Sequence, residues 1–234
     1  MKKFELTTEF ITNMFGKKLF RIKALVEFGN VKAGELGGYV EKEENVSQDG
    51  NAWVSGDARV YGDAEVSGDA RVSGNAEVSG NARVSGNARV SGNARVSGNA
   101  EVYGDAWVSG NARVSGNARV YGNAWGSGNA EVYGDAWVSG NAWVYGNARV
   151  SGNARVSSDA DYALVQGFGT EFRCTTFYRG KNKKIMVNCG CFHGDLEGFR
   201  KQVKETRNGK IAKEYLMIAD LMEYHFTSED SSNE

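Results

Sequence analysis

A strict six-residue repeat occupies the middle of the chain and constrains its fold more than any other feature. Residues 55–162 divide into eighteen hexads of the pattern Ser/Tyr-Gly-Asn/Asp-Ala-Xaa-Val. Alanine recurs in every hexad, and valine follows two residues later except at Gly126 and in the degenerate last hexad. A repeat this short and regular predicts a solenoid, in which successive copies stack on one another.

Each position of the hexad suits one part of a short strand and the corner after it. Alanine and valine lie two residues apart, so their side chains point to the same face of the strand, and Xaa points to the other. The Gly-Asn or Gly-Asp pair tolerates the backbone angles of a tight corner. The inward face is then almost only alanine and valine, which predicts a narrow core that stacked coils bury together.

The segment Val-Ser-Gly-Asn-Ala-Arg, as at residues 90–95, resembles the hexapeptide repeat of the left-handed β-helix family. That resemblance implies three hexads per coil, a left-handed coil with a triangular cross-section, and assembly as a trimer. Eighteen hexads then make about six coils. The expected fold is mainly β, a left-handed parallel β-helix with an N-terminal cap and a small α+β C-terminal domain.

The flanks of the repeat carry a narrower resemblance. Residues 34–41 (Gly-Glu-Leu-Gly-Gly-Tyr-Val-Glu) and 44–47 (Glu-Asn-Val-Ser) resemble the lead-in of phage- and prophage-encoded hexapeptide-repeat proteins that are labelled as transferases. Residues 175–178, 189–192 and 213–216 resemble a small C-terminal domain of phage proteins. The resemblance implies a phage protein with a host protein as partner, but it carries no defined activity.

The chain is expected to have four parts. These are an N-terminal cap (1–50), the β-helix (51–162), a small α+β domain (163–226) and a disordered acidic tail (227–234). Caps are expected because an open solenoid end exposes apolar core and unpaired backbone.

The α+β domain is predicted from its patterning. Residues 172–178 and 185–192 predict a hairpin, and Leu196, Phe199 and Val203 lie at helical spacing. A second helix is expected after Asn208-Gly209.

Composition narrows the functional classes. The formal net charge of -1 gives no reason for general affinity for nucleic acid or an anionic membrane. No apolar run is long enough to span a bilayer, and the first residues lack the apolar stretch of a signal peptide. Three cysteines are too few for a disulfide framework, so a cytoplasmic setting is expected.

A coil of three hexads would stack every eighteenth Xaa side chain in an outward column. The first column is Trp53, Arg71, Arg89, Trp107, Trp125 and Trp143. The second is Arg59, Glu77, Arg95, Arg113, Glu131 and Arg149. The third is Glu65, Arg83, Glu101, Arg119, Trp137 and Arg155. The third column alternates in sign over four coils, which predicts a ladder of cross-strand ion pairs.

Two groups of outward residues are candidates for binding. The aromatic group, expected to form a contact surface, is Tyr103, Trp107, Tyr121, Trp125, Tyr133, Trp137, Trp143 and Tyr145. The arginines, expected to form a basic belt around the middle coils, are Arg71, Arg83, Arg89, Arg95, Arg113 and Arg119. Stacking within the sheet would also explain the aromatics, and a solvated surface would explain the belt. An anionic partner is the alternative for the belt.

Acyl transfer is the enzymatic alternative, because many left-handed β-helix proteins are acyltransferases with a catalytic histidine near a coil and an inserted loop. This chain has only His193 and His225, both outside the hexads, and the hexads contain no insertion. The sequence therefore favours a non-catalytic structural or binding protein without a cofactor. An acyltransferase-like site between subunits is the second hypothesis.

Cys189, Cys191 and His193 alternate along an expected strand, and Cys174 could face them across the hairpin. Zinc takes cysteine and histidine at tetrahedral sites, so these four residues are candidate ligands. Their spacing is not that of a zinc knuckle, and a cysteine-histidine nucleophile pair would lack an orienting group. Core packing of the cysteines is the alternative, and no metal site is predicted.

Overall fold

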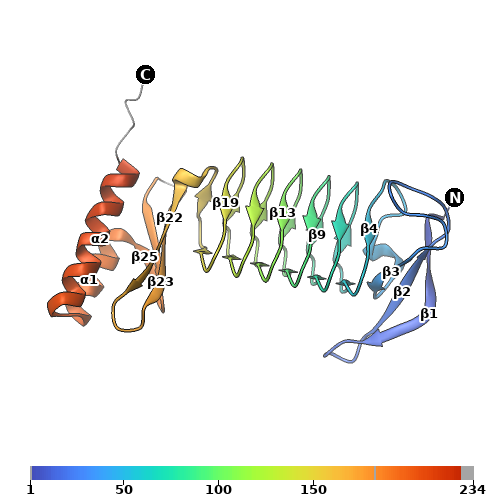
Figure 1. The fold of residues 1–234 in the computed structure, drawn as a ribbon, viewed down its shortest axis with the longest axis horizontal. Coiled ribbons are helices and arrows are strands. Elements are labelled where there is room, and N and C mark those ends of the chain that lie inside the picture. The colour runs from blue at the N-terminus through green and yellow to red at the C-terminus, as the bar shows by residue number, and fades with distance from the viewer. Residues whose placement is uncertain (1, 182, 228–234) are drawn as a thin grey trace, which may run out of the picture.

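The computed structural model describes residues 2–181 and 183–227. A straight parallel β-solenoid forms the middle of an elongated molecule, with a β-hairpin at its N-terminal end and a small sheet with two helices at its C-terminal end (Figure 1). The fold is mainly β, as the hexads predict.

The hexads form two-residue strands that stack into three parallel sheets. The first sheet contains β4 (Trp53–Val54), β7 (Arg71–Val72), β10 (Arg89–Val90), β13 (Trp107–Val108), β16 (Trp125–Gly126) and β19 (Trp143–Val144). The second contains β5 (Arg59–Val60), β8 (Glu77–Val78), β11 (Arg95–Val96), β14 (Arg113–Val114), β17 (Glu131–Val132) and β20 (Arg149–Val150). The third contains β6 (Glu65–Val66), β9 (Arg83–Val84), β12 (Glu101–Val102), β15 (Arg119–Val120), β18 (Trp137–Val138) and β21 (Arg155–Val156).

The strand register confirms the coil of three hexads. Arg89 pairs with Arg71 on one side and with Trp107 on the other, each eighteen residues away. The corner glycines adopt a left-handed conformation, as at Gly92 with φ of 68°. A Cβ on Gly92 would lie 3.0 Å from the carbonyl oxygen of Gly110 in the next coil, so only glycine allows the coils this approach.

The core is a single narrow column of alanine and valine. From Ala52 to Val156, these inward side chains are at most 2% exposed. The column is interrupted at Gly126, which has no side chain where the hexads around it have valine. A Cβ built on Gly126 would meet no other atom within 4 Å, so the surrounding residues do not fill the space. The solenoid therefore contains an unfilled position beside Val108 and Val144, the in-register partners of Gly126.

The solenoid begins before the first hexad. β3 (Leu36–Val40) pairs in parallel with β5, and Val46 forms a parallel bridge with Val66. The protein thus has about seven turns rather than the six expected from the hexads. The hexad pattern does not predict this turn, for two reasons. Val40 and its partner Val60 are twenty residues apart instead of eighteen, and the segment around Val40 lacks the repeat.

The N-terminal hairpin extends the second sheet. β1 (Phe4–Thr12) pairs antiparallel with β2 (Lys18–Ala24), and β2 pairs antiparallel with β3. The short helix η1 (Glu43–Asn45) follows β3. Antiparallel pairing ends the stack of parallel coils, so the open edge of this sheet is covered by the chain itself.

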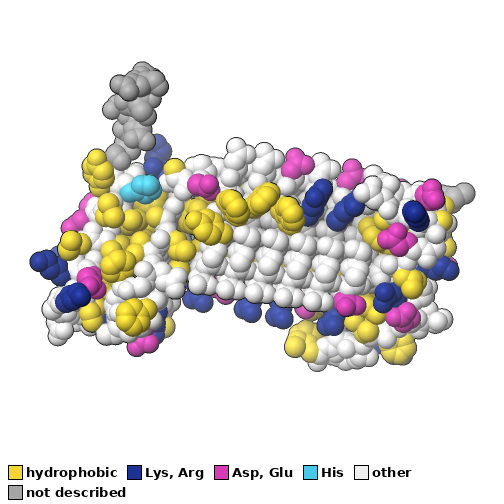
Figure 2. Space-filling view, viewed as in Figure 1, with side chains coloured by type: hydrophobic (Ala, Val, Ile, Leu, Met, Phe, Trp, Pro, Cys, Tyr) yellow, Lys and Arg dark blue, Asp and Glu magenta, His cyan; other side chains and the backbone are white. Residues whose placement is uncertain are grey.

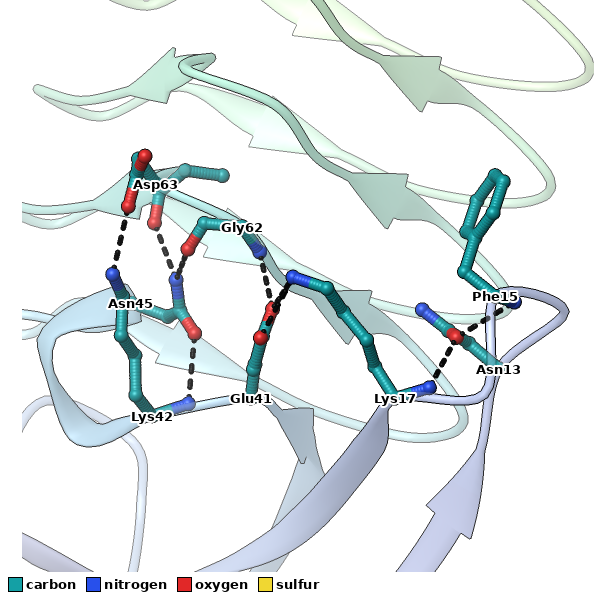
Figure 3. A network of polar contacts seen from close by, with 9 residues as sticks. Asn13, Phe15, Lys17, Glu41, Lys42, Asn45, Gly62 and Asp63 are labelled. Atoms are coloured by element: carbon teal, nitrogen blue, oxygen red, sulfur yellow. Dashed lines mark hydrogen bonds and ion pairs between the residues drawn. The ribbon is translucent and has the colours of Figure 1, made fainter.

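Side chains replace the backbone partners that the first hexads lack on this side (Figure 3). The Glu41 carboxylate accepts hydrogen bonds from the Gly62 backbone N–H (2.7 Å) and the Lys17 ammonium (2.8 Å). The Lys17 hydrogen bond holds the pKa of Glu41 below its usual value. The buried Asn45 amide donates to the carbonyl oxygens of Gly62 (3.1 Å) and Ala64 (2.8 Å).

An antiparallel sheet closes the other end of the solenoid. The helix η2 (Asp159–Asp161) leads to β22 (Tyr162–Phe168), β23 (Arg173–Arg179), β24 (Ile185–Cys189) and β25 (Phe192–Asp195). β23 lies between the solenoid and the helices. Tyr178 belongs to the solenoid core, whereas Phe177 packs with the helices.

The helices α1 (Leu196–Thr206) and α2 (Gly209–Thr227) follow the small sheet. Phe199 of α1 and Ile218 and Ala219 of α2 pack together in a second core. α2 includes Thr227, the first residue of the expected tail, and the rest of that tail, 228–234, lies outside the described residues.

Neither helix in the described part of the chain is long and apolar enough to cross a membrane.

Filling the gap at Gly126 should stabilise the protein. We expect Gly126→Val to raise the free energy of unfolding by about 1–2 kcal/mol, because it restores a buried valine in an open position. Urea unfolding followed by circular dichroism measures this change. Gly122→Ala is the control. Its left-handed φ of 68° and a Cβ distance of 3.2 Å to the Gly140 backbone predict destabilisation. A loss of stability in Gly126→Val would contradict the open position.

Asn45 should be the critical side chain of the N-terminal end. Asn45→Ala leaves two carbonyl oxygens of the first coil without this partner, so we expect a loss of about 1–3 kcal/mol in the free energy of unfolding. Lys42→Ala is the matched control, since it removes only the exposed ion pair with Asp63 and should change stability much less. Equal losses in the two variants would refute this role.

Candidate binding surface

Three tryptophans line up on the first sheet and continue into a tyrosine. We call Trp107, Trp125, Trp143 and Tyr145 the tryptophan strip. The ring centroids of Trp107 and Trp125 are 5.1 Å apart and those of Trp125 and Trp143 are 5.3 Å apart, both pairs edge to face. Tyr145 continues the contact at 5.8 Å from Trp143. The strip runs along the solenoid axis.

The strip is ordered by the sheet yet remains open to solvent. The indole N–H of Trp107 donates to the Ser91 hydroxyl and that of Trp143 to the Ser127 hydroxyl, both at 3.2 Å. Trp125, Trp143 and Tyr145 are nevertheless 40%, 45% and 53% exposed. Figure 2 shows hydrophobic side chains aligned along this side of the solenoid, with basic side chains next to them toward the N-terminal end. Rigid, exposed aromatic rings are typical of interaction surfaces.

The other candidate aromatics lie on different sheets. Tyr103 and Tyr121 stack in parallel at the corner that follows the third sheet, with centroids 4.9 Å apart. Trp137 lies edge to face with Tyr121 and beneath the Arg155 guanidinium, 4.1 Å from the ring centroid. Tyr133 follows β17 of the second sheet. The eight aromatics are therefore spread around the solenoid instead of forming one surface.

Desolvation raises the pKa of Tyr103, and Tyr103, Tyr121 and Trp137 are only half-exposed. Stacking within the third sheet accounts for these three residues.

The arginines of the basic belt are also divided among the three sheets. Arg113 and Arg119 pair with glutamates, at 3.9 Å to Glu131 and 3.1 Å to Glu101. The Glu101–Arg119 pair is the one ion pair within the third column among described residues, so the expected ladder forms only in part. Arg83 and Arg95 also have a glutamate as their in-register neighbour.

Arg71 and Arg89 differ from the rest of the belt. They are in-register neighbours on the first sheet, and their other neighbours in the column are Trp53 and Trp107. Among the described residues, neither arginine forms an ion pair, which is also true of Arg83 and Arg95, but within the belt only Arg71 and Arg89 have no glutamate as an in-register neighbour. The Arg89 guanidinium lies 5.8 Å from the Trp107 ring centroid, which joins the arginine pair to the tryptophan strip.

A groove of about 500 Å³ runs beside this pair at the N-terminal end of the first sheet. Its lining includes Trp53, Arg71, Arg89, Trp107 and the loop residue Val31. Trp53 was expected to point outward, but it is only 4% exposed. Phe28 packs against it with centroids 5.4 Å apart. Sequence reasoning missed the groove because the covering loop lies more than twenty residues before Trp53.

The four candidate metal ligands are not brought together. Cys189 packs against the helices, whereas the Cys174 thiol contacts the Asn147 carbonyl of the solenoid at 3.5 Å. Cys191 is exposed, and His193 lies beside Gly152 of the last coil. Burial raises the pKa of Cys174. Among the described residues, no cluster of three or more cysteine, histidine or acidic side chains has the geometry to hold a metal ion.

Comparison with known proteins supports the solenoid. A family described as the YdcK beta-solenoid repeat matches residues 76–92, 82–97, 88–104, 94–110, 112–128 and 142–158. The chain is a β-solenoid repeat protein. The match covers part of the hexads and leaves the two ends unassigned, and no curated protein matches the chain.

The geometry of the strip should be visible in solution. Tryptophan rings held 5.1 and 5.3 Å apart at fixed angles couple their excited states, so we expect an exciton couplet in the far-ultraviolet circular dichroism. Trp125→Ser removes the middle ring and should abolish most of the couplet. Trp137→Ser is the control, because its ring contacts a tyrosine and not another tryptophan. A couplet that survives Trp125→Ser would refute the arrangement.

Proposed function

We propose that the protein is a non-catalytic binding protein whose rigid solenoid presents the tryptophan strip to a macromolecule. The strip carries this proposal. It is a continuous row of aromatic rings in which Trp125, Trp143 and Tyr145 are exposed and Trp107 is half-buried, and its three tryptophans lie on strands of the first sheet. Exposed rings lose little conformational freedom on binding, which makes them efficient contact residues.

The distribution of polar groups supports a binding role over a catalytic one. The outward Xaa positions of the coils carry arginine, tryptophan and glutamate, the corners carry serine and asparagine, and the two histidines of the chain lie outside the coils. Asparagines of successive coils bond to each other, as Asn93 does to Asn111 at 3.1 Å. These amides hold the corners of the coils together.

The narrower expectations remain part of the proposal. The hexapeptide-repeat resemblance favours a left-handed coil and a trimer, and the flanking resemblance favours a cytoplasmic phage protein with a host partner. The division into cap, solenoid and C-terminal domain is likewise proposed. The alternative function is acyl transfer at a site between subunits, where His193 beside Gly152 would be the base.

The proposal is tested by removing the strip and keeping the fold. We expect Trp125→Ser/Trp143→Ser to lose most of the partner that the wild-type protein captures from a host lysate, quantified by mass spectrometry. Light scattering on the same variant reports whether the strip also mediates self-association.

Trp137→Ser is the matched control and should retain the partner, because its ring lies on the third sheet. Full retention of both partner and mass by the double variant would contradict the proposal. Binding of acetyl-CoA at micromolar affinity, measured by calorimetry, would favour the alternative.

A further inference from the structure

The outward column of the first sheet is complementary to a reversed copy of itself. From Arg71 to Trp143 it contains two arginines, the central Trp107 and two more tryptophans, each one coil apart. A two-fold axis through Trp107 and perpendicular to the sheet places Arg89 of one copy opposite Trp125 of a second copy. The same axis places Arg71 opposite Trp143. Each of these arginines then faces a tryptophan of the other copy.

The shape of the first sheet follows the same order. The groove of about 500 Å³ is lined by Arg71 and Arg89, with the loop residue Val31 and Trp107 also in its lining. Beyond Trp107, Trp125 and Trp143 are 40% and 45% exposed. The two-fold axis therefore brings the exposed rings of each copy to the groove of the other. Surfaces related in this way form an isologous contact, which closes on two copies.

The charges around the groove favour an uncharged aromatic occupant. Glu35 lines the groove, and Asp69 and Asp105 lie beside Arg71 and Arg89. These carboxylates offset the two guanidinium charges, so a neutral ring leaves the local charge balanced. A guanidinium plane also packs well on the face of an indole ring. A tryptophan side chain meets both conditions.

The third sheet already contains the contact that is expected across the axis. Trp137 lies between Arg119 and Arg155, with the guanidinium carbons 5.4 and 4.1 Å from its ring centroid. In the first sheet, the column neighbours of Trp125 and Trp143 are tryptophans, so no arginine of their own column packs on them. A second copy supplies the arginines that these two rings lack.

The two ends of the first sheet also match. The loop around Phe28 covers Trp53 on the outer side of the sheet. Trp53 is one coil before Arg71, so the axis places this loop opposite the segment one coil after Trp143. A hollow of about 260 Å³ lies there, lined by Tyr145, Asp159, Tyr162, Ala163 and Leu164. The covering loop of one copy thus meets a recess in the other.

We propose that the first sheet is the interface between two antiparallel copies of this chain, with Trp125 and Trp143 of each copy packed against Arg89 and Arg71 of the other. The inference rests on the binding function proposed above and names a second copy as the partner of the tryptophan strip. A two-fold contact produces an even number of copies. It forms a dimer by itself, or a hexamer together with the trimer contact that the repeat resemblance favours.

Sedimentation equilibrium of the full chain tests the contact. The wild-type protein should associate reversibly. Trp125→Arg should weaken association about tenfold or more, because it replaces an arginine–indole contact with two opposed guanidinium groups across the axis. Adding Arg89→Trp to Trp125→Arg should restore association, because each guanidinium then faces an indole again. A ring that only stabilises its own sheet predicts no such recovery.

Two serine variants provide the matched comparison. Trp125→Ser removes a ring from the first sheet and should weaken association, whereas Trp137→Ser removes a ring from the third sheet and should not. Circular dichroism confirms that each variant is folded. Equal association of the two serine variants, or no recovery when Arg89→Trp is added to Trp125→Arg, overturns the inference.

Photo-cross-linking determines the orientation of the two copies. A benzoylphenylalanine introduced in place of Tyr145 should capture residues 28–32 of a second copy. Mass spectrometry of mixed isotope-labelled protein identifies the links that join two copies. Capture of the C-terminal half of the second copy instead indicates a parallel arrangement and overturns the inference. A wild-type protein that stays monomeric up to millimolar concentration, or that forms only trimers, overturns it as well.

The two proposals fail separately. If the wild-type protein is monomeric but captures another partner through the tryptophan strip, the second copy is not the partner and the binding function stands. If Trp125→Ser/Trp143→Ser keeps both its mass and every partner, the binding function itself fails.

Discussion

Backbone hydrogen bonding between successive coils is the interaction on which the rest of the structure depends. Each coil donates to the next at nearly constant distance, as Arg89 N–H does to the Ala106 carbonyl at 2.9 Å and Asn93 N–H to the Gly110 carbonyl at 2.8 Å. This stacking requires glycine at the corners, where a Cβ would meet the next coil. It also keeps the interior so narrow that only alanine and valine fill it. The stacking also fixes the register of the strands, so each Xaa side chain lies directly beside the Xaa side chains of the coils before and after it.

The same constraint makes the two ends the places where the fold departs from the repeat. A coil at either end lacks a neighbour for its backbone groups, and unpaired buried groups are costly. At the N-terminal end, Glu41 and Asn45 bond to the backbone of the first hexads. At the C-terminal end, Thr176 accepts from the Arg149 backbone N–H at 3.0 Å, and Asn188 donates to the Arg149 carbonyl at 2.9 Å. The solenoid has a finite length because non-repeating sequence supplies these groups.

Because outward residues stack in columns, a residue type that recurs every eighteen positions forms an extended surface. Three tryptophans spaced eighteen residues apart become one strip, and Arg71 and Arg89 become a pair of adjacent arginines beside Glu35, Asp69 and Asp105. Elsewhere Glu101 forms an ion pair with Arg119, and Tyr103 stacks against Tyr121, so these outward neighbours contact each other within the protein. The first sheet therefore differs from the other two in what it leaves available to a ligand. Its strip and groove share Trp107, which makes them one continuous surface.

The sequence by itself determined the solenoid and its inside and outside, because a six-residue period leaves one way to bury alanine and valine together, whereas the membership of each column followed from the three-hexad coil that the hexapeptide-repeat resemblance implies. It also predicted both helices and the pairing of β23 with β24 from local patterning, but the strand expected over 185–192 ends at Cys189 and turns back into β25, which separates Cys189 from His193. Only the tertiary structure decided that the coils begin at β3, where a spacing of twenty residues hides the turn from the repeat. It also decided that the loop near Phe28 buries Trp53 beside Arg71 and Arg89. These features depend on contacts between segments far apart in the chain, which no local period encodes.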